Sequence, residues 1–208
     1  MFKMDLIERI VYINLDKRPD RRAQIEEELK RMNLHGKHFS ALDLPDHGAV
    51  GCTISHAQVV RQAANDRVSS LLVLEDDFYW KVPDRATLDR RLTETIDALP
   101  TYDVIMFDYS IDIGEPLNEY CTRGRAVSCA AGYLVAGHYL DRLATCLEES
   151  ATLFMQQPHV HWLYTIDQYW KRLQATDQWY CATPRFGTQC DGYSNCSNNI
   201  SKHTYNLT

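Results

Sequence analysis

The feature that most constrains the fold of this chain is an alternation of short apolar runs with amphipathic helical segments. Residues 10–13 are compact and rich in β-branched side chains, and a helix-start signal at residues 18–20 follows them. In the next segment Ile25, Leu29 and Met32 recur at i, i+4 and i+7, which predicts a helix at residues 21–32. A strand that leads into an amphipathic helix is the repeating unit of parallel α/β sheets.

The same alternation continues through most of the chain. Further strands are predicted at residues 38–41, 70–74 and 104–107, and further helices at residues 51–64, 86–99 and 139–147. Thr53 or Ser55 is available as the N-cap of the helix at 51–64, and Pro100 ends the helix at 86–99. The predicted fold is a single α/β domain in which helices flank a mainly parallel sheet.

Composition excludes several classes of protein. A chain of 208 residues with 45% hydrophobic side chains can bury a core without help from metals or disulfides. Its 28 acidic and 22 basic residues give a net charge of -6, which provides no electrostatic footprint for nucleic acid. The seven cysteines are odd in number and form no CxxC pair, so we expect reduced, mostly buried thiols.

The two ends of the chain carry further signals. Asp5 and Glu8 occupy the region where a signal peptide needs an apolar run, and apolar runs such as residues 71–74 are too short to span a bilayer. We therefore expect a soluble, cytoplasmic protein with no membrane span. Residues 190–208 are rich in Asn and Ser, and we interpret them as a tail that follows a domain at residues 1–189.

Three carboxylates follow the apolar run at 71–74 without a break. Adjacent Glu75, Asp76 and Asp77 repel one another unless a cation lies between them. Ligands of open α/β sheets bind beyond the carboxyl ends of the strands. Alternation along the chain places Glu75 and Asp77 on the same side, so we predict that these two share a Mn²⁺ or Mg²⁺ ion. A solvated acidic loop and the acidic start of a helix are the alternatives.

Three blocks of sequence resemble glycosyltransferase family 25, which includes bacterial lipooligosaccharide galactosyltransferases and procollagen galactosyltransferases. Residues 74–77 (LEDD) resemble the acidic strand-end motif of that family. Residues 11–22 resemble its opening strand with the INLD.R.DR stretch, and residues 49–56 resemble its GEIGCALSH block. Weaker matches follow in the family's order, at residues 131–135, at residues 166–167, and at Pro184, Gln189 and Ser194.

The resemblance implies a GT-A fold, a divalent metal, a nucleotide-sugar donor and inversion at the anomeric carbon. The expected protein is a metal-dependent inverting glycosyltransferase. It would move a hexose, galactose or glucose, from a UDP-sugar to an acceptor hydroxyl on a glycan or a collagen-like protein. Two alternatives stay open, namely a catalytically silent module that binds nucleotide sugars and a UDP-sugar hydrolase.

The family match also suggests residues that hold the donor. Asn14 and Leu15, at the exit of the first strand, are candidate contacts of the nucleotide. Arg18 and Arg21 follow them, and guanidinium groups suit phosphate oxygens, although ordinary solvation at a helix start is the alternative. Asp76 is a further candidate for this role.

Four more residues complete the predicted donor contacts. Ser55 and His56 are expected at a helix N-terminus, which favours anions; the alternatives are an N-cap for Ser55 and a satisfied, half-buried histidine for His56. Gln189 and Ser194 are candidate donor contacts in the C-terminal block of the resemblance.

Asp167 is the predicted general base. It resembles the acceptor-side aspartate of the family, and it precedes a Gln-Tyr-Trp patch at residues 168–170. Aromatic side chains of this kind can stack on a sugar or a peptide. The alternative is an aspartate that caps a helix.

Overall fold

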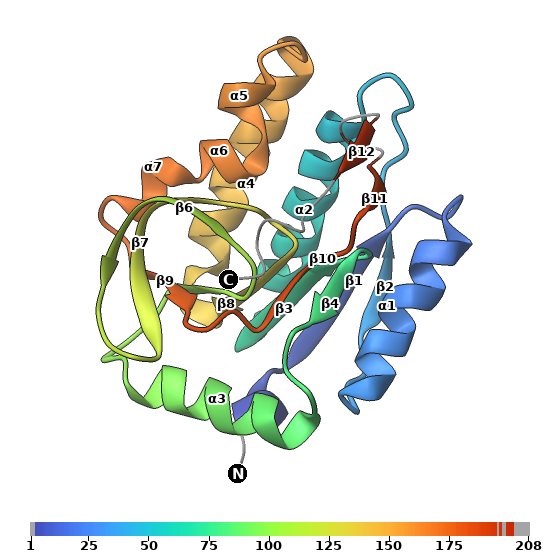
Figure 1. Cartoon of the computed structure of the whole chain (residues 1–208). Helices are drawn as coiled ribbons and strands as arrows, with labels where there is room; N and C mark the ends of the chain where they lie inside the picture. Colours follow the sequence, from blue (N-terminus) through green and yellow to red (C-terminus); the bar gives the residue numbers. More distant parts are fainter. Residues whose placement is uncertain (1–2, 195, 197–198, 202–208) are drawn as a thin grey trace.

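The protein is described by a computed structural model that covers residues 3–194, 196 and 199–201, with helices on both faces of a central sheet (Figure 1). The strands of this sheet are β1 (Arg9–Asn14), β2 (Lys37–Ser40), β3 (Ser70–Glu75), β5 (Val104–Met106), β6 (Ser110–Pro116), β7 (Cys121–Ser128), β8 (Gly132–Ala136) and β9 (Trp179–Ala182). Their order across the sheet is β2-β1-β3-β8-β5-β9-β7-β6. Two small antiparallel pairs complete the strands, β4 (Phe78–Trp80) with β10 (Gly187–Gln189) and β11 (Gly192–Ser194) with β12 (Asn199–Ser201).

The helices lie mostly in the connections between strands. They are α1 (Pro19–Arg31), α2 (Gly48–Asn65), α3 (Arg85–Asp97), α4 (Leu140–Gln156), α5 (His161–Tyr164), α6 (Ile166–Tyr169) and α7 (Lys171–Gln174), with 3-10 turns η1 (Lys3–Leu6) and η2 (Gly137–Tyr139). Within the described residues, none of these helices combines the length and the apolar character that a bilayer crossing requires.

The sheet is mixed, with most strands pointing one way. β1 pairs in parallel with β2 and with β3, and β5 pairs in parallel with β9. β8 runs antiparallel to β3 and β5, and β7 runs antiparallel to β9 and β6. The short connection between β6 and β7 explains one reversal, because only a crossover allows consecutive strands to pair in parallel. The predicted α/β domain, a mainly parallel sheet flanked by helices, is confirmed.

The core has two halves, one on each face of the sheet. Leu71 and Val73 of β3 pack into the half that α2 and α4 cover, whereas Leu72 and Leu74 pack into the half beneath α1 and α3. All four side chains are fully buried. A strand that is buried on both faces reads as an unbroken apolar run, which is why residues 71–74 signalled a strand at the centre of the sheet.

The predicted strands at 10–13, 38–41, 70–74 and 104–107 are confirmed to within a residue or two, as are the helices at 21–32 and 86–99. The predicted start of the helix at 51–64 is wrong. α2 begins at Gly48, so Thr53 and Ser55 lie inside the helix and cap nothing. Their hydroxyls donate instead to carbonyls four residues back, Ala49 O and Gly51 O, at 2.9 and 2.7 Å. The predicted helix at 139–147 continues to Gln156 as α4.

The C-terminal part of the chain returns to the end of β3. A Cβ at Gly187 would collide with the Phe78 ring, so glycine allows β10 to lie close to β4. This approach brings Gln189 beside the residues that follow β3, and the backbone N–H of Cys190 donates to Asp77 O at 2.8 Å. The predicted tail at 190–208 falls largely outside the described residues, although β11 and β12 within it form a hairpin.

Candidate functional site

A cavity of about 490 Å³ lies at the carboxyl ends of β1 and β3. Its wall also includes the loop after β2, the first turns of α2, the start of α6 and residues around β11. The predicted site residues that line it are Asn14, Leu15, Arg18, Arg21, His56, Glu75, Asp76, Asp77, Asp167, Gln189 and Ser194. The fold thus gathers into one cavity residues from five separate parts of the chain.

Three acidic residues at the end of β3 form what we call the acid turn, Glu75, Asp76 and Asp77. The Gln189 side-chain amide nitrogen, Nε2, lies 3.2 Å from Glu75 Oε2 and 3.3 Å from Asp77 Oδ1. These two carboxylates therefore face a common point, whereas Asp76 Oδ2 accepts a hydrogen bond from Asn14 instead. Two carboxylate oxygens that converge in this way fit a hard divalent cation such as Mn²⁺ or Mg²⁺.

Burial and mutual repulsion shape the charge of the acid turn. Burial, reinforced by the charges of Glu75 and Asp76, raises the pKa of Asp77 to about 7. Arg21 opposes this shift, with its Nη1 3.5 Å from Asp77 Oδ2. Burial raises the pKa of Asp76 as well, against the effect of its hydrogen bond from Asn14. Positive charge in the cavity would therefore stabilise the ionised form of this turn.

Two buried polar atoms in the cavity wall lack hydrogen-bond partners within the described part of the chain. They are Asn14 Oδ1 and Arg21 Nη1. Asn14 uses its Nδ2 for Asp76 Oδ2 at 2.7 Å and for Arg18 O at 3.1 Å, and Arg21 uses its Nη2 for Tyr193 O at 3.4 Å. Arg21 Nη1 still forms an ion pair with Asp77 Oδ2 at 3.5 Å, and because buried polar atoms are nearly always paired in native proteins, Asn14 Oδ1 is the atom of the two that is left for a bound ligand.

Arg18 combines a helix-start contact with a place in the cavity wall. Its Nε and Nη2 donate to Asp20, and this bonding raises the pKa of Arg18. Its Nη1 reaches Tyr193 O at 3.5 Å. Both sequence-based interpretations of Arg18 are therefore compatible with where the side chain lies.

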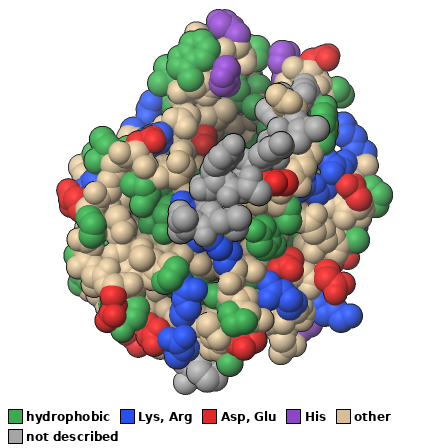
Figure 2. Space-filling model, viewed as in Figure 1, with side chains coloured by type: hydrophobic (Ala, Val, Ile, Leu, Met, Phe, Trp, Pro, Cys, Tyr) green, Lys and Arg blue, Asp and Glu red, His purple; other side chains and the backbone are tan. Residues whose placement is uncertain are grey.

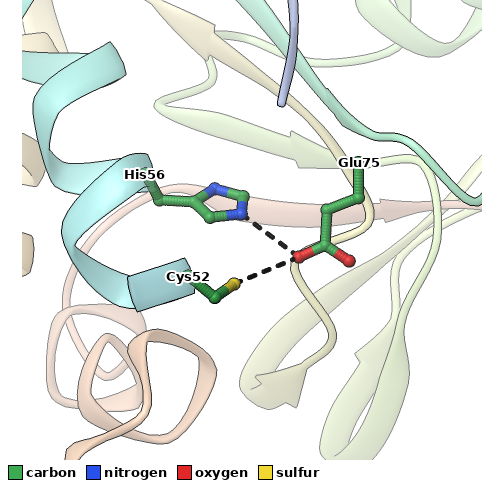
Figure 3. A group of neighbouring side chains, drawn as sticks. All are labelled: Cys52, His56 and Glu75. Carbon is green, nitrogen blue, oxygen red and sulfur yellow. Dashed lines mark hydrogen bonds and ion pairs between the residues drawn. The ribbon is translucent and has the colours of Figure 1, made fainter. Parts of the chain in front are cut away.

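His56 lies inside α2, not at the helix N-terminus that we predicted for it, and it is fully buried. Figure 3 shows it beside Cys52 and Glu75, with Cys52 one helical turn earlier on the same face of α2. His56 Nε2 is 3.2 Å and Cys52 Sγ 3.6 Å from the same oxygen, Glu75 Oε1. The sequence reasoning missed Cys52, although the Cys-x₃-His spacing was a signal that could have found it.

Ser55 is the one predicted site residue that does not line the cavity. Its hydroxyl is fully buried, donates to Gly51 O and accepts from the Leu42 backbone N–H at 2.9 Å. The expected anion-binding position at a helix N-terminus is therefore wrong for this residue. Ser55 instead fixes the loop after β2 against α2.

Asp167 is the second residue of α6 and is half-buried in the cavity wall. Its Oδ2 accepts a hydrogen bond from the backbone N–H of Cys129 at 3.2 Å. Cys129 has a φ of 83°, a left-handed conformation that is uncommon outside glycine and that recurs at functional sites. The sequence reasoning did not single out Cys129, and no local pattern marks it.

The predicted aromatic surface next to Asp167 is wrong. Tyr169 and Trp170 are 3% and 0% exposed, with Tyr169 OH bonded to Glu149 and Trp170 Nε1 to Val127 O. They belong to the core that packs on the sheet. An exposed aromatic side chain, Trp162 at 63%, lies on α5, at the end of the molecule where Figure 2 shows hydrophobic and histidine side chains together.

Comparison with known proteins supports the resemblance that the motifs suggested. The chain is 25% identical to a "Glycosyltransferase 25 family member" of Drosophila melanogaster, over 75% of this chain and 32% of that protein. It is 27% identical to a protein of the same description from Drosophila pseudoobscura pseudoobscura, over 49% of this chain and 20% of the relative. The sequence resemblance to family 25 is thereby confirmed, and the chain spans about a third of the length of the first of these relatives.

Solved structures show more distant likenesses. One is a glycosyltransferase involved in glycosylation of the major capsid of PBCV-1, with a TM-score of 0.45 and 12% identity over 91% of this chain and 95% of that one. Another is A197 from STIV, with a TM-score of 0.46 and 12% identity over 94% and 95%. These values are too low for either likeness to bear on function. No protein-family model matches the chain.

Proposed function

We propose that this chain is the catalytic domain of a metal-dependent, inverting glycosyltransferase that moves a hexose from a UDP-sugar to an acceptor hydroxyl. The acceptor class that the motif resemblance implies is a glycan or a collagen-like protein. The observation that carries this proposal is one cavity that joins the acid turn to two side chains of β1 and α1. They are Asn14, whose Oδ1 has no hydrogen-bond partner among the described residues, and Arg21, which forms an ion pair with Asp77. Sequence similarity to family 25 supports the reaction class.

The donor would bind along the carboxyl ends of β1 and β3. Arg21 is 6% exposed and lines the cavity with its Nη1 held 3.5 Å from Asp77 Oδ2, so its guanidinium would bind a diphosphate oxygen at little cost in side-chain ordering. Asn14 Oδ1 would accept a hydrogen bond from the nucleoside. Leu15, Arg18, Asp76, Gln189 and Ser194 complete the proposed donor contacts.

Glu75 and Asp77 are the proposed metal ligands. The approach of both carboxylates to one Gln189 nitrogen, 3.2 and 3.3 Å away, supports a shared ion. When bound, Mn²⁺ or Mg²⁺ would offset the negative charge that develops on the leaving diphosphate. Arg21 would act on the same charge and would hold the Asp77 carboxylate ionised.

Asp167 is the proposed general base. The hydrogen bond from Cys129 N–H uses Asp167 Oδ2, which leaves Oδ1 available to the acceptor within the described part of the chain, and the side chain lines the donor cavity. Asp167 would take the proton from the acceptor hydroxyl as the acceptor oxygen bonds to the anomeric carbon and the bond to UDP breaks. Attack from the face opposite the leaving group inverts the configuration of that carbon.

The test is to measure binding and turnover of a panel of UDP-hexoses, with and without Mn²⁺, for the wild-type chain and for Asp77→Ala. Collagen-like peptides that contain hydroxylysine and a set of oligosaccharides serve as acceptors. We expect metal-dependent binding of one UDP-hexose, acceptor-dependent release of UDP, and loss of the metal effect in Asp77→Ala.

The alternatives give different results in the same assay. UDP released at the same rate with and without every acceptor would identify a hydrolase. Binding without release in any condition would identify a silent binding module. A folded chain that binds no UDP-sugar at all would contradict the proposal.

A further inference from the structure

We propose that Cys52, His56 and Glu75 form a binding site for a thiophilic divalent cation, with Zn²⁺ as the ion that fits the donor set. This site shares Glu75 with the proposed Mn²⁺ ligands but takes its other two donors from α2, and its existence does not depend on glycosyl transfer.

The three donor atoms already have the spacing of a metal site. Cys52 Sγ, His56 Nε2 and one Glu75 carboxylate oxygen all lie within 4.8 Å of one another (Figure 3). Zn²⁺ binds sulfur at about 2.3 Å and nitrogen or oxygen at about 2.0–2.2 Å, so tetrahedral ligands lie roughly 3.3–3.6 Å apart. The distances from Glu75 Oε1, 3.2 Å to His56 Nε2 and 3.6 Å to Cys52 Sγ, match that spacing.

Rigid elements hold all three ligands. Cys52 and His56 are one turn apart on α2, so their side chains share a helix face, and Glu75 is the last residue of the central strand β3. His56 is fully buried, which limits the freedom of its ring. A site built on a helix and a strand loses little entropy when a cation binds.

The second nitrogen of His56 has the partner that a metal-bound histidine needs. His56 Nδ1 lies 2.9 Å from the hydroxyl oxygen of Tyr133, which is buried and can accept the Nδ1–H. Metal-bound histidines usually donate their other ring N–H to such an acceptor, and this contact fixes the tautomer. Nε2 is then free to bind the cation.

A sulfur donor distinguishes this site from the acid turn. Glu75 directs Oε1 to Cys52 and His56 and Oε2 to Gln189, which also contacts Asp77. The mixed sulfur, nitrogen and oxygen set favours Zn²⁺, whereas the carboxylates of Glu75 and Asp77 favour Mn²⁺ or Mg²⁺. Cys196 lines the same cavity.

The experiment uses Co²⁺ as a spectroscopic substitute for Zn²⁺, on the reduced full chain after removal of metals by a chelator. We expect one equivalent of Co²⁺ to produce a thiolate charge-transfer band, and one equivalent of Zn²⁺ to abolish it. Cys52→Ser should remove the band and weaken Zn²⁺ binding at least tenfold, and His56→Gln should weaken it similarly. Asp77→Asn and Cys190→Ser are the matched controls and should keep both signals.

Several results would overturn the proposal. The first is that the wild-type chain with Co²⁺ shows no thiolate charge-transfer band. The others are that the band survives in Cys52→Ser or disappears in Cys190→Ser. Loss of Zn²⁺ binding in Asp77→Asn alone would move the ion to the acid turn.

A second measurement needs no variant and therefore stays informative if the variants do not fold. In the wild-type chain, Zn²⁺ should protect Cys52 from alkylation by iodoacetamide while leaving Cys190 reactive. Equal alkylation of Cys52 with and without Zn²⁺ would contradict the site.

Discussion

Asn14, the last residue of β1, donates a 2.7 Å hydrogen bond from Nδ2 to Asp76 Oδ2, just beyond the end of β3. This bond joins the ends of two neighbouring parallel strands. It holds Asp76 away from the point where Glu75 and Asp77 meet Gln189, and it leaves Asn14 Oδ1, in the cavity wall, without a hydrogen-bond partner among the described residues. One amide thereby organises the acid turn and presents an acceptor to a ligand.

Asn14→Ala should therefore lower both the stability of the chain and its affinity for UDP. The half-buried Asp76 would lose its hydrogen bond from Asn14, and such a loss costs about 1–3 kcal/mol. Urea unfolding measures the first effect and isothermal titration with UDP the second. Asn65→Ala, on the exposed end of α2, is the control and should change the free energy of unfolding by less than about 0.5 kcal/mol. Equal stability of the two variants would contradict the role of Asn14.

Asp77→Asn should change how stability depends on pH. The folded-state pKa of Asp77, about 7, lies above the ordinary 3.8 of an aspartate. Asp77 therefore favours the folded state most below about pH 4, and this contribution is lost as the pH rises through 7. The asparagine variant lacks that loss. With a chelator present, we expect it to exceed the wild type in stability at pH 8 by on the order of 2 kcal/mol, since one pKa unit corresponds to about 1.4 kcal/mol.

The corresponding measurement is urea unfolding of both proteins at pH 5 and pH 8. The difference between them should shrink at pH 5, where Asp77 is mostly protonated in the folded chain. A difference that is the same at both pH values would mean that Asp77 ionises like an exposed aspartate.

Arg21→Lys should weaken UDP binding while leaving the fold intact. Lysine keeps the charge but lacks the planar pair of donors that reaches both Asp77 and the cavity. Loss of a charge-assisted hydrogen bond of about 1.5–3 kcal/mol corresponds to roughly ten- to hundredfold weaker binding. The neighbouring Arg22 pairs with Glu26 on the outer face of α1, so Arg22→Lys should bind UDP like the wild type. Unchanged binding in Arg21→Lys would remove this residue from the donor site.

Asp167→Asn should slow glycosyl transfer without weakening the binding of UDP. Asparagine can still accept the hydrogen bond from Cys129 N–H, so the cavity should keep its shape and its affinity for UDP. It cannot take a proton, and loss of a general base slows transfer by about 10²–10⁴-fold. Asp112→Asn, an exposed aspartate on β6, is the control. Transfer at the wild-type rate in Asp167→Asn would exclude Asp167 as the base.

Trp170→Ala should lower the free energy of unfolding, because this side chain is buried. Removal of a fully buried tryptophan costs about 3–5 kcal/mol, and the Val127 carbonyl also loses its hydrogen bond from Nε1. Trp162→Ala, on the exposed surface of α5, should change stability by less than about 0.5 kcal/mol. Thermal unfolding of the two variants compares these effects, and equal melting temperatures would contradict the packing described for Trp170.

Local sequence patterns were sufficient for the parts of the fold that periodicity controls. The run at residues 71–74 predicted β3 because a strand buried on both faces has no polar positions. The spacing of Ile25 and Leu29 predicted α1 because it matches the helical repeat. In both cases the signal lies within a few residues along the chain.

Other elements had no such signal. β6 is mostly exposed and carries Ile111 and Ile113 on its surface, and its pairing with β7 is irregular, so burial follows no period of two along either strand. β9 is only four residues long, a length at which a buried strand and a helical turn look alike. The aromatic pair Tyr169 and Trp170 has the same composition whether it stacks on a ligand or fills the core, and only packing against the sheet decided for the core.

The sequence by itself determined the chemistry of the acid turn and its position after the central strand, because backbone geometry links three consecutive carboxylates to the strand before them. The tertiary structure alone decided their partners. Gln189 meets Asp77 from 112 positions away, and His56 meets Glu75 from 19 positions away. Such contacts depend on how whole strands and helices pack, and no spacing along the chain encodes them. The helix α2 therefore brings Cys52 and His56 to Glu75 through packing, not through any motif that includes all three residues.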